Sequence, residues 1–236
     1  MAGALYLCDY FYWGFHLRGS RFVVSSIASL VIVAGGGAAA VQVKDNVTNG
    51  QRCESVKARI AETGVVVQGR GEAGTVALGD SYAAGDWLED RTQGWAYTVA
   101  EQVAGVGLTG YTNGGYCGDA SFSERLSTVT DLHPSTLIIQ GGLNDTDASA
   151  ANIESAAADL LEDVADIPTV ILIGPTNAPA KSDLQKVDRA LAAAAKDHQR
   201  EYISALEWDL EFLPDRLHLT PAGHAEFAEL VKASLG

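Results

Sequence analysis

The sequence predicts an α/β protein, a three-layer α/β/α sandwich built on a mostly parallel sheet of five strands. Two observations predict this class. Short, continuously apolar runs such as Ser135–Gln140 and Thr169–Ile173 are typical of strands that are buried on both faces of a sheet. These runs alternate along the chain with longer amphipathic segments of helical spacing, and that alternation is typical of parallel sheets covered by helices on both faces.

The individual elements follow one another from Gly71 onward. The predicted strands are Thr75–Leu78, Gly110–Asn113, Ser135–Gln140, Thr169–Ile173 and Tyr202–Ala205. The predicted helices are Gly94–Val106, Ser149–Val164, Ser182–Gln199 and Thr220–Leu235. The last helix has the clearest start, because Thr220 is a suitable N-cap and Pro221 fits the first helical position.

Charge and composition exclude several classes of protein. The formal net charge is −14, which argues against a nucleic-acid partner, since phosphate binding depends on Lys and Arg. Three cysteines are too few for a disulfide scaffold, and no CxxC pair marks a zinc site. The charge is uneven along the chain. Residues 1–70 carry an excess of basic residues and residues 71–236 are strongly acidic, which favours neutral or cationic substrates.

The first 41 residues predict an N-terminal export signal or membrane anchor. Phe22–Val41 is uncharged over 20 residues, enough to span a bilayer, and Arg18 and Arg21 precede it. Its small residues Ala38–Ala40 suit a signal peptidase, so a cleaved signal is favoured over an anchor. We therefore expect a secreted or cell-envelope protein, with membrane contact only through residues 22–41 if they are retained. Residues 42–70 are a linker or N-terminal extension, either a stalk or a first helix at Cys53–Thr63.

Polar and glycine-rich segments follow the predicted strands, where sites form in parallel sheets. In Gly79-Asp80-Ser81, the serine stands at a strand-to-helix turn that suits a nucleophile. In Asp215-Arg216-Leu217-His218, the spacing of three lets the carboxylate hold the imidazole Nδ1–H. Asn113–Gly118 and Gly142–Asp145 offer backbone and amide donors for a developing oxyanion, and Asp145 is expected to brace its loop. Each segment alone is also compatible with an ordinary turn.

In this order, the four segments resemble the motif blocks of the SGNH hydrolases, also called the GDSL esterase/lipase family. The resemblance covers about residues 71–236, which we take as the catalytic domain, and it implies the family's flavodoxin-like fold. It implies that Ser81 is the nucleophile, His218 the general base and then acid, and Asp215 the orienting carboxylate. The implied oxyanion donors are the backbone N–H groups of Ser81 and Gly118 and the Asn144 amide. No metal or organic cofactor is implied.

The sequence departs from the family pattern at the position before Gly118. A small polar residue is usual there, whereas this chain has Cys117. If the body is exported, Cys53 and Cys117 can form a disulfide, although two buried free thiols are an equal alternative. Tyr82, Trp87 and Tyr116 lie beside the motif blocks and are candidates for the substrate pocket, with plain packing as the alternative.

The resulting hypothesis is a monomeric serine esterase that forms an acyl-enzyme. No inserted lid separates the blocks, so short acyl esters or O-acetylated carbohydrates fit better than long triglycerides. Two alternatives stay open: a lysophospholipase or thioesterase acting on lipid esters, and a non-catalytic surface module that binds acyl or sugar ligands. An α/β-hydrolase is disfavoured, because its acid and base are rarely three positions apart and the body is short for that fold.

Overall fold

The computed structural model describes residues 37–235, and of residues 37–48 it describes the backbone alone. Most of the predicted export signal or anchor, residues 1–41, lies outside the described residues. Residues 38–235 belong to one compact unit. The strands are β1 (Val67–Gln68), β2 (Glu72–Gly79), β3 (Ala100–Gly105), β4 (Thr136–Gln140), β5 (Thr169–Ile173) and β6 (Glu201–Ile203). The α-helices are α1 (Gly37–Thr63), α2 (Ser81–Ala84), α3 (Trp95–Val99), α4 (Ser127–Thr130), α5 (Ala150–Asp163), α6 (Leu184–Asp197) and α7 (Pro221–Leu235), and the 3₁₀ turns are η1 (Arg91–Gln93), η2 (Gly115–Cys117) and η3 (Ser123–Arg125).

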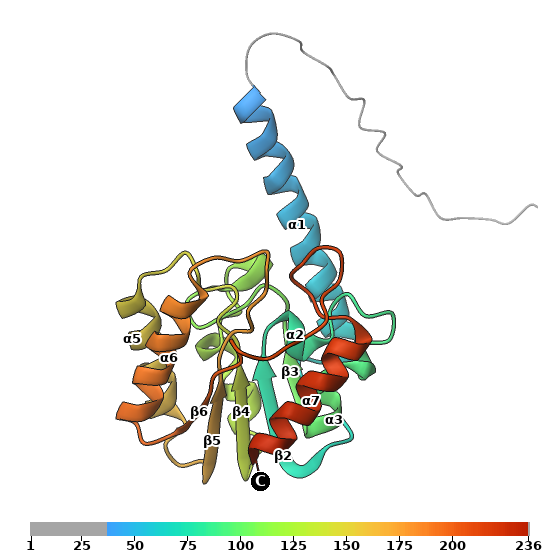
Figure 1. The fold of residues 1–236 in the computed structure, drawn as a ribbon. Helices are drawn as coiled ribbons and strands as arrows, with labels where there is room; N and C mark the ends of the chain where they lie inside the picture. Colours follow the sequence, from blue (N-terminus) through green and yellow to red (C-terminus); the bar gives the residue numbers. More distant parts are fainter. Residues whose placement is uncertain (1–36, 236) are drawn as a thin grey trace, which may run out of the picture. The chain divides into compact units, whose positions relative to one another are not determined.

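The sheet has the strand order β1-β3-β2-β4-β5-β6, and every pairing except that of β1 with β3 is parallel. Strand β2 lies between β3 and β4, so the chain moves to one side of β2 and then crosses to the other. That reversal is a topological switch point, and ligands of open α/β sheets bind beyond the carboxyl ends of the strands there. The end of β2 is therefore the position in this fold best placed for chemistry (Figure 1).

Helices cover both faces of the sheet (Figure 1), and a cluster of apolar side chains lies on each face. Helices α5 and α6 pack on one face against side chains such as Leu78, Leu137 and Leu172, and α3 and α7 pack on the other face. Neighbouring residues of a strand serve opposite layers, since Leu78 belongs to the first cluster and Ala77 to the second. This alternation explains the continuously apolar strands, and it confirms the predicted three-layer class.

The structure corrects the prediction of five strands, because the sheet has six. The segment predicted as one helix, Gly94–Val106, divides into the short helix α3 and the strand β3. Gly110–Asn113, predicted as a strand, lies in a loop closed by the bridge between Thr109 and Gly114. Parallel pairing with β2 fixes β3 as a strand and overrides the helical spacing of its residues, because strand formation depends on tertiary neighbours.

The segment predicted as a linker or extension, residues 42–70, contains most of α1 and the whole of β1. Strand β1 pairs antiparallel with β3 and forms the edge of the sheet. A disulfide joins Cys53 of α1 to Cys117 of η2, the pair proposed from the sequence. None of the helices within residues 37–235 is both long and apolar enough to span a bilayer.

Removal of the disulfide should lower the stability of the protein. It closes a loop of 64 residues, and the chain-entropy relation gives a stabilisation of roughly 4 kcal/mol for a loop of that size. Cys53→Ser/Cys117→Ser should therefore unfold at a lower urea concentration than the parent protein. Reductant should lower the parent's midpoint and leave that of the double variant unchanged, and two titratable thiols before reduction would contradict the bond.

Candidate active site

Ser81 stands directly after the central strand, as the first residue of helix α2. The turn that leads to it requires a glycine, since a Cβ on Gly79 would lie 2.8 Å from both the Ala83 Cβ and the Gln140 backbone oxygen. Asp80 caps α2 by accepting a hydrogen bond from the Tyr82 N–H at 2.9 Å. The cap and the close packing fix the direction in which the Ser81 side chain leaves the sheet.

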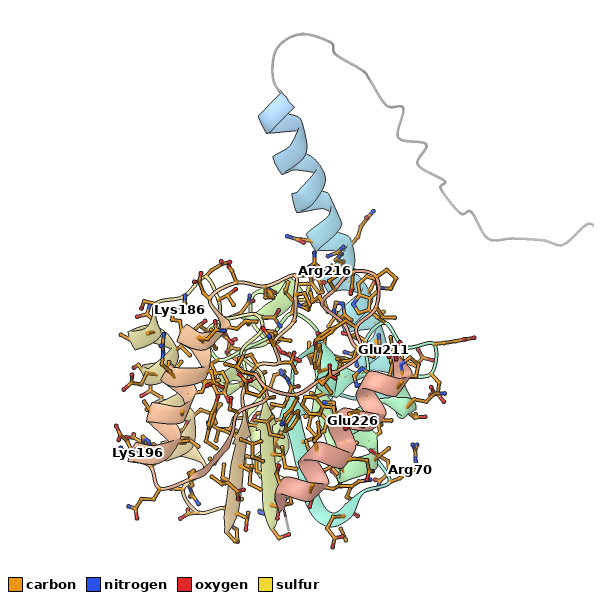
Figure 2. The ribbon with its side chains drawn as sticks, viewed as in Figure 1. Arg70, Lys186, Lys196, Glu211, Arg216 and Glu226 are labelled. Atoms are coloured by element: carbon orange, nitrogen blue, oxygen red, sulfur yellow. A yellow bond between two sulfur atoms is a disulfide. The ribbon has the colours of Figure 1, made fainter. Side chains whose placement is uncertain are left out.

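Asp215 and His218 form a hydrogen-bonded pair on the loop before α7. The His218 Nδ1 lies 2.6 Å from the Asp215 Oδ2, and the other carboxylate oxygen accepts the backbone N–H groups of Leu217 and His218, each at 3.0 Å. Arg216 allows this tight loop by adopting a left-handed φ of 58°, and Figure 2 shows Arg216 among the loops above the sheet. Desolvation opposes ionisation of Asp215, but these hydrogen bonds outweigh it and hold its pKa below the ordinary value.

Asn144 follows β4 and is held by the loop that comes after β3. Its Nδ2 donates to the Thr109 backbone oxygen at 3.0 Å, and its own backbone oxygen accepts from the Asn113 Nδ2 at 3.1 Å. The neighbouring Asp145 accepts hydrogen bonds from the Tyr111 N–H and from the N–H and hydroxyl of Thr112. The sequence predicts that Asp145 braces its own loop, and in the structure it joins that loop to the one after β3.

Three of these side chains, Ser81, Asn144 and His218, line one cavity of about 70 Å³. Trp87 and Tyr116 line it as well, and the Trp87 ring lies 5.0 Å from the His218 ring between centroids. The cavity brings a hydroxyl, an imidazole backed by a carboxylate, and an amide donor together. A group of this composition can activate a hydroxyl nucleophile and stabilise an oxyanion.

Two residues named from the sequence lie elsewhere. Tyr82, a candidate for the substrate pocket, is 1% exposed, and its hydroxyl donates to the Leu217 backbone oxygen. It therefore supports the loop of His218 from within the core and does not line the cavity. Gly118, the candidate oxyanion glycine, is exposed at the end of η2, and its N–H donates to the Gly115 oxygen at 3.2 Å.

Asp86 is a residue of this site that the sequence did not reveal. Glu89 and Asp90 are exposed, but the nearby Asp86 is half-buried and lines the same cavity as Ser81. Burial raises the pKa of Asp86, and the nearby Arg91 opposes that rise through an ion pair of 2.8 Å. The only signal in the sequence was its position, five residues after the serine.

Arg125 is the second residue that sequence reasoning missed. Its guanidinium is buried below the site and donates to the backbone oxygens of Gly79, Ala104 and Ala120 and to the Thr109 hydroxyl, at 2.8–3.1 Å. Desolvation lowers the pKa of Arg125 to about 10, so it remains charged near neutral pH. Arg125 thus joins the carboxyl ends of β2 and β3 to the loop that positions Asn144.

Among residues 49–235, whose side chains the structure describes, no cluster of three or more His, Cys, Asp or Glu side chains could hold a metal ion. The side chains that converge in the cavity are instead suited to nucleophilic and acid–base chemistry.

Comparison with known proteins places the chain in a family. Residues 77–226 match the model of the GDSL-like Lipase/Acylhydrolase family. No curated protein sequence matches the chain.

Three solved structures share the fold at low sequence identity. A lipase/acylhydrolase from Enterococcus faecalis is 17% identical with a TM-score of 0.55, covering 68% of this chain and 94% of its own. The aryl esterase of M. smegmatis is 16% identical with a TM-score of 0.56, over 68% and 97% of the two chains. An acetylxylan esterase from Geobacillus stearothermophilus is 13% identical with a TM-score of 0.54, over 70% and 95%.

Replacing Arg125 should destabilise the protein. Arg125→Met would leave several buried carbonyl oxygens without a donor, at a cost of about 3 kcal/mol or more in the free energy of unfolding. Arg70→Met is a matched control, because the Arg70 side chain is exposed and makes a single hydrogen bond, to the Thr92 backbone oxygen. Urea titrations that give equal losses for the two variants would contradict the role of Arg125.

The buried carboxyl group of Asp80 should make the free energy of unfolding depend on pH. Burial raises the pKa of Asp80 to about 7, although the Tyr82 N–H opposes this. Between about pH 4 and pH 7 the carboxyl ionises in the unfolded chain and stays protonated in the folded one, so stability falls as the pH rises. Asp80→Asn cannot ionise at this position and so does not lose this stability. The free energy of unfolding of the variant minus that of the parent should therefore increase by a few kcal/mol as the pH rises from about 4 to about 7.

The matched control for this pH dependence is Asp90→Asn. Hydrogen bonds from the Thr92 hydroxyl and N–H lower the pKa of the exposed Asp90. Its contribution to stability therefore has the opposite sign and is lost as the pH falls. Urea unfolding at several pH values measures both slopes, and a difference between parent and Asp80→Asn that does not change with pH would refute the assignment.

Proposed function

The chain belongs to the GDSL-like lipase/acylhydrolase family, and on that premise we propose that it is a serine esterase acting outside the cytoplasm. Its substrates are short-chain acyl esters or O-acetylated carbohydrates. One observation carries the proposal most strongly: His218 lines the same small cavity as Ser81, and its Nδ1 lies 2.6 Å from the Asp215 carboxylate.

The residues of the cavity supply each step of acyl transfer. His218 takes the proton of the Ser81 hydroxyl while the oxygen attacks the carbonyl carbon of the ester. Asp215 accepts the hydrogen bond from Nδ1, so the imidazole presents its Nε2 to the serine and its positive charge is stabilised. His218 then gives the proton to the departing alcohol, and a water molecule activated by the same imidazole releases the acid from the acyl-enzyme.

The oxyanion donors in this proposal are Ser81, Asn144 and Gly118. The Ser81 N–H lies in the first turn of α2, where backbone donors have no partner within a helix. The Asn144 amide carries two N–H bonds and gives one of them to the Thr109 oxygen, which leaves the other for substrate. The Gly118 N–H can contribute only after it releases the Gly115 oxygen, a local change of the η2 turn.

The size of the cavity supports the choice of substrate. A space of about 70 Å³ suits an acetyl or similarly short acyl group, and it disfavours the long acyl chains of a lysophospholipase. The solved structures of the acetylxylan and aryl esterases accord with this choice. A thioesterase remains the alternative within the family. The exported location rests on the predicted signal in residues 1–41, with a single-pass anchor as its alternative.

Ser81→Ala should abolish turnover. Loss of the nucleophile is expected to lower kcat for p-nitrophenyl acetate by about 10⁴-fold or more, because no covalent intermediate can form. The matched control is Ser234→Ala, an exposed serine of α7 whose hydroxyl donates to the Leu230 backbone oxygen of the same helix. Ester turnover that survives Ser81→Ala would overturn the assignment. Labelling by a fluorophosphonate probe distinguishes an enzyme from a non-catalytic binding module, which would stay unlabelled.

A further inference from the structure

A second cavity adjoins the candidate active site. It measures about 380 Å³ and is lined in part by side chains from the carboxyl-terminal half of helix α1. Asp86, Trp87 and Tyr116 line both this cavity and the one that contains Ser81. The two spaces are therefore neighbours separated by shared side chains, and we call the larger one the arginine groove, after the Arg52, Arg59 and Arg91 side chains that line it.

The charge of the arginine groove is opposite to that of the chain. Three guanidinium groups line it against one carboxylate, that of Asp86, in a protein whose formal net charge is −14. The acidic composition predicted a preference for neutral or cationic substrates. The fold reverses that expectation locally, because α1 brings two arginines from the basic first part of the chain beside the site.

The three arginines differ in how they are engaged. Arg91 pairs with Asp86 at 2.8 Å. Arg52 donates to the Tyr116 hydroxyl at 3.2 Å and lies over its ring. For the Arg59 guanidinium, no hydrogen bond or ion pair is found within residues 49–235, whose side chains the structure describes.

The surroundings of Arg59 also disfavour its positive charge. It is only partly exposed, and burial together with the positive charge of Arg91 lowers its pKa. Partial burial of a charge without a partner costs free energy, and an anion placed against it recovers part of that cost. Guanidinium groups bind carboxylate and phosphate through paired N–H donors.

The sizes of the two cavities indicate which part of an ester each could hold. The space beside Ser81, at about 70 Å³, accommodates a short acyl group. The arginine groove is about five times larger and shares Trp87 and Tyr116 with that space, so it has room for the alcohol part of the ester. Aromatic side chains at its entrance suit a ring of a sugar or a phenol.

We propose that the arginine groove binds an oxyanion group, carboxylate or phosphate, on the alcohol part of the ester, with Arg59 as its principal contact. The protein would then act on short-chain esters of acidic alcohols, such as an acetylated sugar acid. This inference rests on the proposed esterase function and adds the class of the alcohol. The disulfide between Cys53 and Cys117 holds α1, and with it Arg52 and Arg59, against the site.

The test compares 4-acetoxybenzoate with its neutral methyl ester, and adds 4-acetoxyphenyl phosphate as a second anion. The measured quantity is the ratio of kcat/KM for each anionic ester to that for the neutral one. Comparing this ratio between proteins cancels the intrinsic reactivity of the esters. Arg59→Gln should lower it about tenfold, the effect of losing one charged hydrogen-bond donor pair. The anion with the larger decrease identifies carboxylate or phosphate as the preferred group.

Lys57→Gln is the matched control. It removes the same charge from the same helix, but Lys57 pairs with Glu54 and does not line the groove. Its ratio should equal that of the parent, and raising the salt concentration should weaken the anionic preference of the parent. Arg52→Gln, at an exposed position, repeats the test if Arg59→Gln does not fold. Ratios within about twofold of the parent for the groove variants would overturn the proposal.

Failure of the esterase function would be seen separately. If the parent protein hydrolyses neither ester, the proposed activity is wrong, and calorimetry then tests the groove alone. Binding of 4-hydroxybenzoate that is tighter than binding of its methyl ester, and that Arg59→Gln weakens, would support the groove. Equal or absent binding of the two compounds would overturn it.

Discussion

One buried cation organises the end of the sheet on which the candidate site depends. Arg125 donates to backbone oxygens at the ends of β2 and β3 and to the Thr109 hydroxyl, in a region from which water is excluded. Parallel strands leave carbonyl groups at their carboxyl ends, and these need donors when they are buried. A guanidinium can satisfy several of them from one point, because its five donors are fixed in a plane.

The geometry of the site follows outward from this cation. The Thr109 hydroxyl accepts a hydrogen bond from Arg125, and the Thr109 backbone oxygen accepts one from the Asn144 amide. Asn113 and Asp145 then link the loop after β3 to the loop after β4. Asn144 is therefore held by bonds that pass through the same loop that Arg125 supports. A buried hydrogen-bond network stabilises a protein only when each of its donors and acceptors has a partner. This requirement restricts the loop to one arrangement.

The same loop carries Cys117 and so connects the site to the N-terminal part of the chain. Through the disulfide, α1 lies against a loop that itself lines the site, and Tyr116, next to the cysteine, contacts Arg52. A segment that the sequence left open as a linker or an N-terminal extension thereby supplies side chains to the surroundings of the candidate site. Its basic residues alter the local field where an acidic protein would otherwise repel anions.

The sequence by itself determined the class of the fold and three of the side chains that meet in the cavity, those of Ser81, Asn144 and His218. Buried strands must be apolar on both faces, and the chemistry of acyl transfer requires a hydroxyl, an imidazole, a carboxylate and amide donors, so both leave local patterns. The Asp215–His218 contact was predictable because three positions of spacing already bring the two groups together. Only the tertiary structure decided that Ala100–Gly105 is a strand, that Tyr82 faces the core, and that the Gly118 N–H donates to the Gly115 oxygen. It also decided the inward positions of Asp86, Arg125 and Arg59. Tyr82, Arg125 and Arg59 have neighbours far away in the sequence, and a single charged residue looks the same in a sequence whether water or the protein surrounds it.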